Sequence, residues 1–155
     1  ASGPYGRFCL FPNDANRRYL LVGTGTGITP YRAMLPQLES LMRDRGVEVV
    51  LVQGARNPGE LLYGDEFRAF ADAHPGFRYM PCLSRELPDA ASPHAHADVR
   101  HGYVQAALEE LQPDPEHDTA YLCGNPDMVD ACFELLKQRG LAIGRIRREK
   151  YVSNK

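Results

Sequence analysis

The sequence predicts an α/β fold: a doubly wound, mainly parallel sheet of about five strands with helices on both faces. Three observations predict it. Apolar runs alternate with segments of helical periodicity along most of the chain, as in repeated strand–helix units. A run over Arg18–Val22 leads directly into a turn rich in glycine. A second run, Val47–Val52, is apolar at nearly every position, which is typical of a strand buried on both faces of a parallel sheet.

Composition narrows the class of protein. A chain of 155 residues is most simply one domain, and it is long enough to bury a core of its own. The formal net charge of -2 gives no electrostatic support for nucleic acid or an anionic membrane as partner. No apolar run approaches the ~20 residues that cross a bilayer, so no membrane span is expected. The cysteines are widely spaced without a Cys-x-x-Cys pair, which favours a reducing cytoplasm over a disulfide framework or a zinc site.

The residues before the first strand read as an approach segment. Gly3-Pro-Tyr-Gly6 is turn-forming, and Phe8-Cys-Leu-Phe11 is a short apolar run. Two interpretations stay open here: a surface tail with one short strand, or the end of a connection from a preceding domain.

A long helix is expected after the first strand and its turn, Gly23–Thr29. Pro30 suits the first turn of a helix, because proline has no N–H to leave unpaired. The helix runs to about Arg45, where Gly46 stops it. Its apolar residues recur at helical spacing, at Ala33, Met34, Leu38, Leu41 and Met42.

The alternation of strand and helix continues through the rest of the chain. A loop over Gln53–Gly59 follows the second strand, and a helix over Tyr63–His74 ends at Pro75-Gly76. Phe77–Leu83 is the third strand, weakened by Pro81. The later elements are a loop at Leu87–Asp98, a helix at Tyr103–Leu111, a strand at Thr119–Cys123, a helix at about Asp127–Arg139 with Gly140 as its C-cap, and a short strand within Ile143–Val152.

Each loop of unusual composition follows a strand. The carboxyl ends of parallel strands meet along one edge of a sheet, so these loops should face one crevice, where such sheets bind ligands. The turn after the first strand leaves backbone N–H groups at a helix N-terminus, which suits a phosphate and predicts a nucleotide site. The converging loops are Gly23–Thr29, Gln53–Gly59, Ser84–Arg100 and Gly124–Pro126.

The glycine turn alone does not decide which nucleotide binds. Gly23, Gly25 and Gly27 alternate, whereas the Gly-x-Gly-x-x-Gly pattern requires glycine where Ile28 stands. The turn also lacks the Gly-Lys-Ser/Thr ending of a P-loop, which disfavours nucleotide hydrolysis. A nicotinamide dinucleotide domain and an S-adenosylmethionine-dependent methyltransferase both remain.

The tip of the second strand discriminates between these classes. Standard members of both place an acidic residue there to bind ribose hydroxyls, but this chain has Gln53-Gly-Ala-Arg56. Arg85 and Arg100 follow the third strand and should reach the same edge. Arginine forks pair well with phosphate oxygens, so the pattern favours a ligand with an additional anionic group, such as a 2′-phosphate.

Four motifs at strand ends carry a family resemblance. With them the chain resembles the NAD(P)-binding domain of the ferredoxin–NADP reductase family over nearly its whole length. The motifs are Gly23-Thr-Gly-Thr-Gly-Ile-Thr-Pro30, Gly54-Ala-Arg-Asn-Pro-Gly-Glu-Leu-Leu-Tyr63, Leu83-Ser-Arg-Glu86 and Cys123-Gly-Asn-Pro-Asp-Met128.

The resemblance implies NADP(H) as cofactor, with NAD(H) as the alternative, and it implies a role for each motif. Ser84 and Arg85 would hold the 2′-phosphate with Arg56 assisting, and Tyr103 would stack on adenine. Cys123 would be the catalytic residue, beside the nicotinamide. Further contacts would come from Gly25, Thr26, Gly27, Thr29 and Pro30 in the turn, from Gly124, Asn125, Pro126 and Met128 in the last motif, and from Tyr151 near a flavin.

Full-length members of that family carry an N-terminal β-barrel that binds FAD, and its Arg-x-Tyr-Ser-like motif is not in this sequence. We therefore expect residues 1–17 to be a remnant of the linker from that barrel and residues 18–155 to form the NAD(P)-binding domain. In the intact enzyme a hydride would pass between nicotinamide and FAD, and electrons would then pass to a ferredoxin, flavodoxin or similar carrier. This chain alone is expected to be inactive in that transfer.

Two other interpretations stay open. One is a methyltransferase, which the missing acid at the second strand disfavours; the other is a non-catalytic nucleotide-binding module, in which the fold serves assembly. His94, His96 and His101 cluster in sequence, but no matching cysteines or carboxylate pair accompany them, and no metal site is expected.

Overall fold

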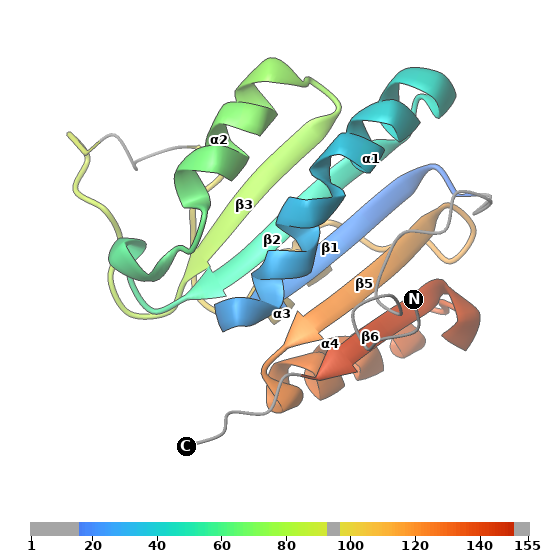
Figure 1. Ribbon diagram of the computed structural model, residues 1–155. Coiled ribbons are helices and arrows are strands. Elements are labelled where there is room, and N and C mark those ends of the chain that lie inside the picture. The colour runs from blue at the N-terminus through green and yellow to red at the C-terminus, as the bar shows by residue number, and fades with distance from the viewer. Residues whose placement is uncertain (1–15, 93–96, 151–155) are drawn as a thin grey trace.

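A computed structural model of the chain describes residues 16–92 and 97–150, shown as a ribbon in Figure 1. Within these residues six strands form one sheet in the order β4-β3-β2-β1-β5-β6, and each neighbouring pair is parallel. The predicted doubly wound parallel sheet is confirmed. The strands are β1 (Arg18–Thr24), β2 (Glu48–Ala55), β3 (Phe77–Leu83), β4 (Arg100–His101), β5 (Asp118–Gly124) and β6 (Ile146–Lys150).

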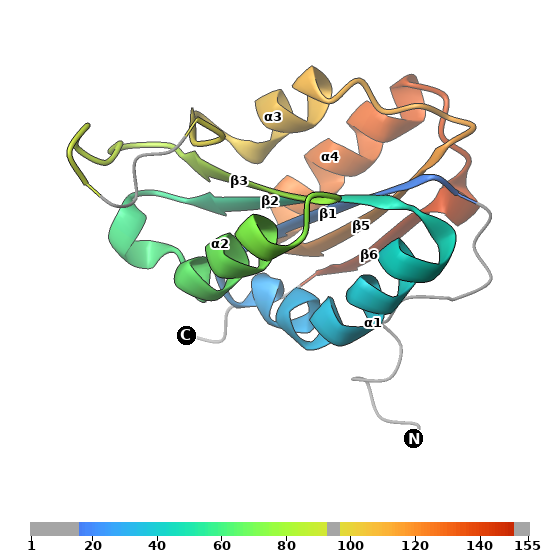
Figure 2. The same cartoon turned by 90° about the horizontal axis from the view of Figure 1, so that it is seen from above.

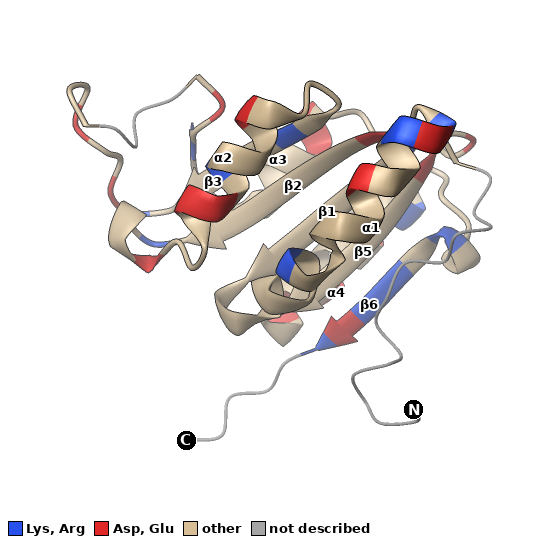
Figure 3. Ribbon diagram, turned by 45° about the horizontal axis from the view of Figure 1, so that its top comes forward, with Lys and Arg blue, Asp and Glu red and all other residues tan. Residues whose placement is uncertain are grey.

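Helices cover both faces of the sheet, as the view from above shows (Figure 2). On one face lie α1 (Thr29–Arg45) and α2 (Gly64–Ala73), and on the other α3 (Val104–Glu110) and α4 (Pro126–Gln138). Short 3-10 helices are η2 (Gly25–Ile28), η3 (Pro58–Glu60) and η4 (Ile143–Arg145). Acidic and basic residues both occur on α1, α2 and β6 (Figure 3).

The sheet separates two apolar cores. Side chains alternate along a strand, so Leu20 and Val22 of β1 pack toward α3 and α4, while Tyr19 and Leu21 pack toward α1 and α2. All four are fully buried. This double burial explains the nearly continuous apolar runs that predicted the fold. None of the helices among the described residues combines the length and apolarity needed to span a bilayer.

Several boundaries differ from the sequence prediction; for example, the sequence predicts that β1 ends at Val22, but the strand continues to Thr24. The sequence assigns Gly54 and Ala55 to a loop, but β2 continues through them because they pair with Cys82 and Leu83 of β3. The prediction of about five strands also missed β4, which lies between the expected loop and helix and pairs with β3 over only two positions. Pro81 is tolerated within β3 because β4 leaves most of that edge unpaired.

The described ends of α1 follow the predicted signals. Pro30 lies in its first turn, and Gly46 ends it with φ of 69° while its N–H donates to Met42 O at 3.0 Å. Most of the expected linker over residues 1–17 lies outside the described residues. Tyr151, His94 and His96 lie outside them too, so the structure says nothing about their predicted roles.

Candidate functional site

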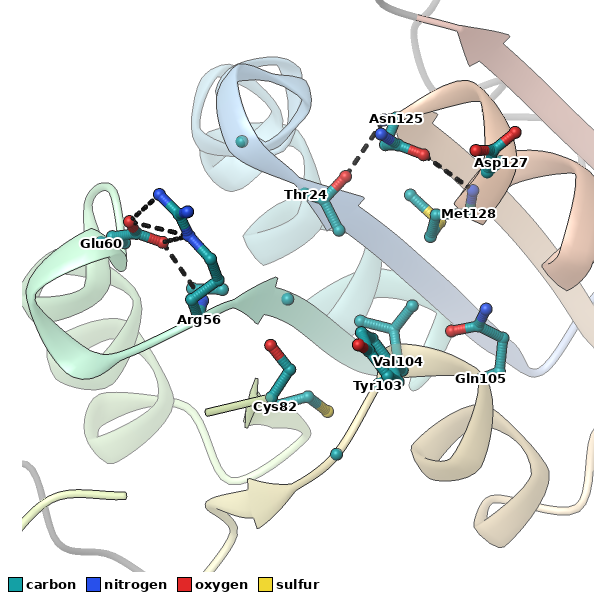
Figure 4. Close-up of a pocket in the computed structure, with 15 residues that line it drawn as sticks. Thr24, Arg56, Glu60, Cys82, Tyr103, Val104, Gln105, Asn125, Asp127 and Met128 are labelled. Atoms are coloured by element: carbon teal, nitrogen blue, oxygen red, sulfur yellow. Dashed lines mark hydrogen bonds and ion pairs between the residues drawn. The ribbon is translucent and has the colours of Figure 1, made fainter. Parts of the chain in front are cut away.

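A cleft of about 560 Å³ opens at the carboxyl ends of the strands, where the sequence predicts the converging loops (Figure 4). Its volume lies in the range of small-molecule and cofactor sites. Apolar lining residues such as Cys82, Val104 and Met128 belong to the core beneath α3 and α4, so the cleft opens on that face. Its lining comprises Thr24, Gly25, Gly54, Ala55, Arg56, Glu60, Cys82, Ser84, Gly102, Tyr103, Val104, Gln105, Asn125, Asp127 and Met128.

The glycine turn after β1 is locked to the turn after β5. A Cβ atom on Gly27 would lie 2.5 Å from Cys123 O, and one on Gly124 would lie 2.6 Å from Thr24 Oγ1. Gly124 also has φ of 133°, a conformation that side chains disfavour. Glycine at both positions therefore lets the two backbones touch, which brings the first and last predicted motifs together.

Hydrogen bonds fix the same contact. Asn125 N donates to Thr24 Oγ1 at 3.1 Å, and Asn125 Oδ1 accepts from Met128 N at 3.1 Å, which caps α4 (Figure 4). Below the turns, the buried Tyr31 hydroxyl lies 2.7 Å from Val22 O and 2.9 Å from Tyr121 O. Burial raises the pKa of Tyr31 well above its usual value, so this hydroxyl keeps its proton and can donate to the strand carbonyls.

The tips of β2 and β3 meet on the other side of the cleft. Ser84 N donates to Ala55 O, and the N–H groups of Arg85 and Glu86 both donate to Arg56 O, each at 3.0 Å. Ser84 is half-buried and lines the cleft, whereas Arg85 is exposed. These bonds place the predicted serine–arginine motif beside the loop that carries Arg56.

Arg56 is bound by a carboxylate that sequence analysis did not single out. Its Nη2 lies 2.6 Å from Glu60 Oε2, its Nε lies 3.1 Å from each carboxylate oxygen, and its backbone N donates to Oε1 at 3.2 Å (Figure 4). Hydrogen bonding from Arg56 lowers the pKa of Glu60, and hydrogen bonding to Glu60 raises the pKa of Arg56. Both groups therefore stay charged at neutral pH.

Gln53 has a structural role at the position where an acidic residue was sought. It is 1% exposed; its Nε2 donates to Leu62 O at 3.0 Å, and its Oε1 accepts from the Tyr79 hydroxyl. Burial raises the pKa of Tyr79, which keeps that phenol protonated as the donor. Gln53 thus anchors the end of the loop that carries Arg56 and Glu60, and its side chain does not line the cleft.

Tyr103 projects from the wall opposite the glycine turn. It is 71% exposed and follows Gly102, whose φ of 133° turns the chain from β4 into α3. An exposed aromatic ring at the edge of a cleft is available for stacking. Its predicted contact with adenine stays a prediction.

Cys123 differs from the other predicted residues in its placement. Its side chain is fully buried in the core between the sheet and α1, on the opposite face from the cleft. Strand alternation is the cause, because Leu122 points toward α4 and Cys123 points away from it. The structure therefore does not bring the sulfur to the cleft, and the catalytic role assigned to it stays a prediction.

Of the residues predicted to bind a cofactor, six line the cleft: Gly25, Arg56, Ser84, Tyr103, Asn125 and Met128. Outside the lining, Thr26, Gly27, Thr29 and Pro30 lie in η2 and the start of α1, while Arg85, Gly124 and Pro126 adjoin lining residues in the chain. Arg100 does not line the cleft either, because its guanidinium binds Glu110 at 2.8 and 2.9 Å. Among the described residues no group of histidine, cysteine and carboxylate side chains is arranged to hold a metal ion.

The structure shows an α/β domain with a cleft at the carboxyl ends of a parallel sheet, which is where sheets of this kind bind nucleotides. Residues 21–134 match the family model described as the oxidoreductase NAD-binding domain. The chain therefore belongs to this family, and its predicted resemblance to ferredoxin–NADP reductases is confirmed.

Known members illustrate the range of the family. The chain is 36% identical to the reductase subunit of aromatic O-demethylase from Amycolatopsis sp., over 98% of this chain and 43% of that protein. It is 32% identical to the root-type chloroplastic ferredoxin–NADP reductase of Nicotiana tabacum, over 88% and 37%. The crystal structure of the Amycolatopsis cytochrome P450 reductase GcoB superposes with a TM-score of 0.77 at 35% identity, over 96% and 42%. The chain thus spans less than half the length of each.

Proposed function

We propose that this chain is the NAD(P)H-binding module of a flavin-dependent oxidoreductase that delivers electrons to a ferredoxin, a flavodoxin or a similar acceptor. One observation carries the proposal: the glycine turn and the Cys123-Gly124-Asn125 turn interlock at one side of a cleft that Arg56 and Ser84 line at the other. A site with phosphate-binding backbone at one end and arginine at the other matches an extended dinucleotide. Family membership decides against the methyltransferase interpretation.

The residues around the cleft are suited to such a ligand. Gly25 is exposed, and a Cβ placed on it would meet no atom within 4 Å, so backbone N–H groups of the turn can be approached closely. The turn and the capped start of α4 would hold the pyrophosphate and the nicotinamide end. Ser84 and Tyr103 would hold the adenosine end, with Arg85 close by.

The bound nicotinamide would supply the hydride, and a flavin held by a separate domain would receive it. The contribution of this chain is to bind and orient the dinucleotide, through a turn whose geometry two glycines and Asn125 fix in advance. FAD, the N-terminal flavin domain and the electron carrier are parts of this proposal, as are NADP(H) as the preferred nucleotide and a cytoplasmic location. Without a flavin domain the chain should bind the nucleotide but transfer no electrons.

The proposal can be tested by calorimetric titration of the purified chain with NADPH and with NADH. We expect saturable binding at one site, and Tyr103→Ala should weaken it by about fivefold to tenfold through lost stacking. Ile143→Ala is the matched control, because Ile143 is also an exposed apolar residue, at 66%, but lies in η4 before β6 begins, at the opposite end of the sheet. Absence of binding by either nucleotide would refute the proposal, and saturable binding of S-adenosylmethionine instead would restore the methyltransferase.

A further inference from the structure

The carboxylate of Glu60 occupies the binding face of an arginine inside the cleft. Glu60 makes three contacts of 2.6 to 3.1 Å with the Arg56 guanidinium, and both residues line the cleft with Ser84. A guanidinium binds a carboxylate and a phosphate through the same N–H groups. Arg56 cannot give those groups to a ligand while Glu60 holds them.

The shape of the loop does not depend on the Arg56–Glu60 contacts alone. Glu60 N donates to Asn57 O at 3.1 Å, and Leu61 N donates to Pro58 O at 3.2 Å, which forms η3. Gln53 anchors Leu62, and Arg56 O accepts two bonds from the β3 tip. Since backbone and buried side-chain bonds already fix the loop, the exposed carboxylate of Glu60 is available for another purpose.

Arg85 is the cation left for a ligand at this end. It is exposed, and among the described residues no acidic side chain forms an ion pair or hydrogen bond with its guanidinium. It lies near enough to lower the pKa of Glu60 through its charge, after the larger effect of Arg56. A ligand group beside Ser84 therefore meets one available guanidinium and one carboxylate.

We propose that Glu60 is the specificity-determining residue for the 2′ position of the adenosine ribose, where its carboxylate weakens the preference for NADPH over NADH that Arg56 and Arg85 would otherwise give. The inference deepens the proposed function and depends on it. A 2′-phosphate offers only acceptor oxygens and negative charge, so it competes with Glu60 for Arg56 and is repelled by its carboxylate. A 2′-hydroxyl can donate a hydrogen bond to that carboxylate instead.

The test uses two ligands that report on the adenosine end alone, 2′,5′-ADP and 5′-AMP, together with NADPH and NADH. Glu60→Gln keeps the size of the side chain and removes its charge, which releases Arg56. We expect Glu60→Gln to strengthen binding of 2′,5′-ADP and NADPH by about threefold to tenfold and to change binding of 5′-AMP and NADH by less than about twofold. The gain should shrink as salt is raised, because it is electrostatic.

Glu66→Gln is the matched control. Glu66 forms an equally short exposed pair, 2.6 Å from Arg32, but lies on α2 outside the cleft. It should leave all four affinities unchanged. Circular dichroism and thermal melting of both variants would verify the fold.

The outcomes separate this inference from the proposed function. If the wild-type chain binds neither dinucleotide, both fall together. If it binds them and Glu60→Gln leaves the ratio of the NADPH and NADH affinities unchanged, the role of Glu60 is refuted while the dinucleotide site stands. An equal change in all four affinities would also refute it, since it would indicate a general effect on the loop.

Discussion

The contact between the two turns predicts a large effect for the smallest possible substitution, Gly27→Ala. The added Cβ would lie 2.5 Å from Cys123 O, 2.6 Å from Gly124 Cα and 2.7 Å from Cys123 C. Favourable contacts between such atoms lie at about 3.5–4.0 Å. One turn must therefore retreat from the other by about 1 Å. All three atoms belong to the backbone, so no side-chain rotation can relieve the overlap.

The expected cost follows from that geometry. Overpacking a close-packed site costs about 1–3 kcal/mol, and the absence of a side chain that can yield places Gly27→Ala in the upper part of this range, at about 2–3 kcal/mol. In a chain of this size that corresponds to a decrease in Tm of about 5–10 °C. Binding of NADPH should weaken too, because Thr24 and Asn125 separate as the turns move.

Two other glycines provide matched controls. Gly144→Ala introduces a Cβ with no atom within 4 Å at an ordinary φ, and should change the free energy of unfolding by less than about 0.5 kcal/mol. Gly25→Ala also has open space but a φ of 56°, and should cost only the backbone strain of about 1 kcal/mol. Thermal melts of the three variants give the order directly. If Gly27→Ala and Gly144→Ala have the same Tm, the two turns do not touch as described.

Three further predictions concern other parts of the chain. In calorimetric titrations, Arg85→Ala should weaken the binding of NADPH by about fivefold to tenfold and leave the binding of NADH unchanged, because it removes the cation available to a 2′-phosphate. Equal effects on the binding of both nucleotides would contradict that assignment. Asp118→Ala should lower the free energy of unfolding by about 2–4 kcal/mol in urea titrations, since it removes the carboxylate that accepts from Arg18 Nε at 2.9 Å and from Nη2 at 2.7 Å and leaves a largely buried guanidinium without its counter-charge. His74 donates from Nδ1 to Phe70 O and lies 3.2 Å from Glu39, and these contacts raise its pKa. The protonated ring therefore stabilises the fold below pH about 6.5, and this stabilisation is lost as the pH rises through the higher pKa of the folded state. The Tm of the wild type should fall between about pH 6 and 8, and the Tm of His74→Gln should fall less over the same range.

Much of the fold could be predicted because its elements carry repeated local signals. The sequence predicts β3 as Phe77–Leu83, and the structure agrees residue for residue, because a Pro-Gly turn precedes a run that is apolar at most positions. β4 could not be found this way, since two residues carry no periodicity and the strand exists only because β3 offers it an edge. The end of β2 could not be predicted, because Gly54 is typical of a loop and its partner, Cys82, belongs to a strand further along the chain.

The candidate site divides in the same way. The glycine turns could be predicted as parts of the site because the glycines directly follow predicted strands in the sequence. Glu60 was not, because its partner four positions earlier lies in a loop whose turn becomes apparent only in three dimensions. The orientation of Cys123 was also hidden, since both faces of β5 are buried and the alternation of polar and apolar residues that would indicate a face is lost.

The place of β1 at the centre of the sheet has a consequence for synthesis of the chain. β1 pairs on one side with β2 and on the other with β5, whose first residue, Asp118, stands 100 positions after Arg18. As the chain leaves the ribosome, β1 therefore keeps one edge of unpaired backbone N–H and C=O groups until most of the domain has been made. Closure of β1 against β5 is the long-range step that should limit the folding rate, and before it the nascent chain is most exposed to aggregation and to capture by chaperones.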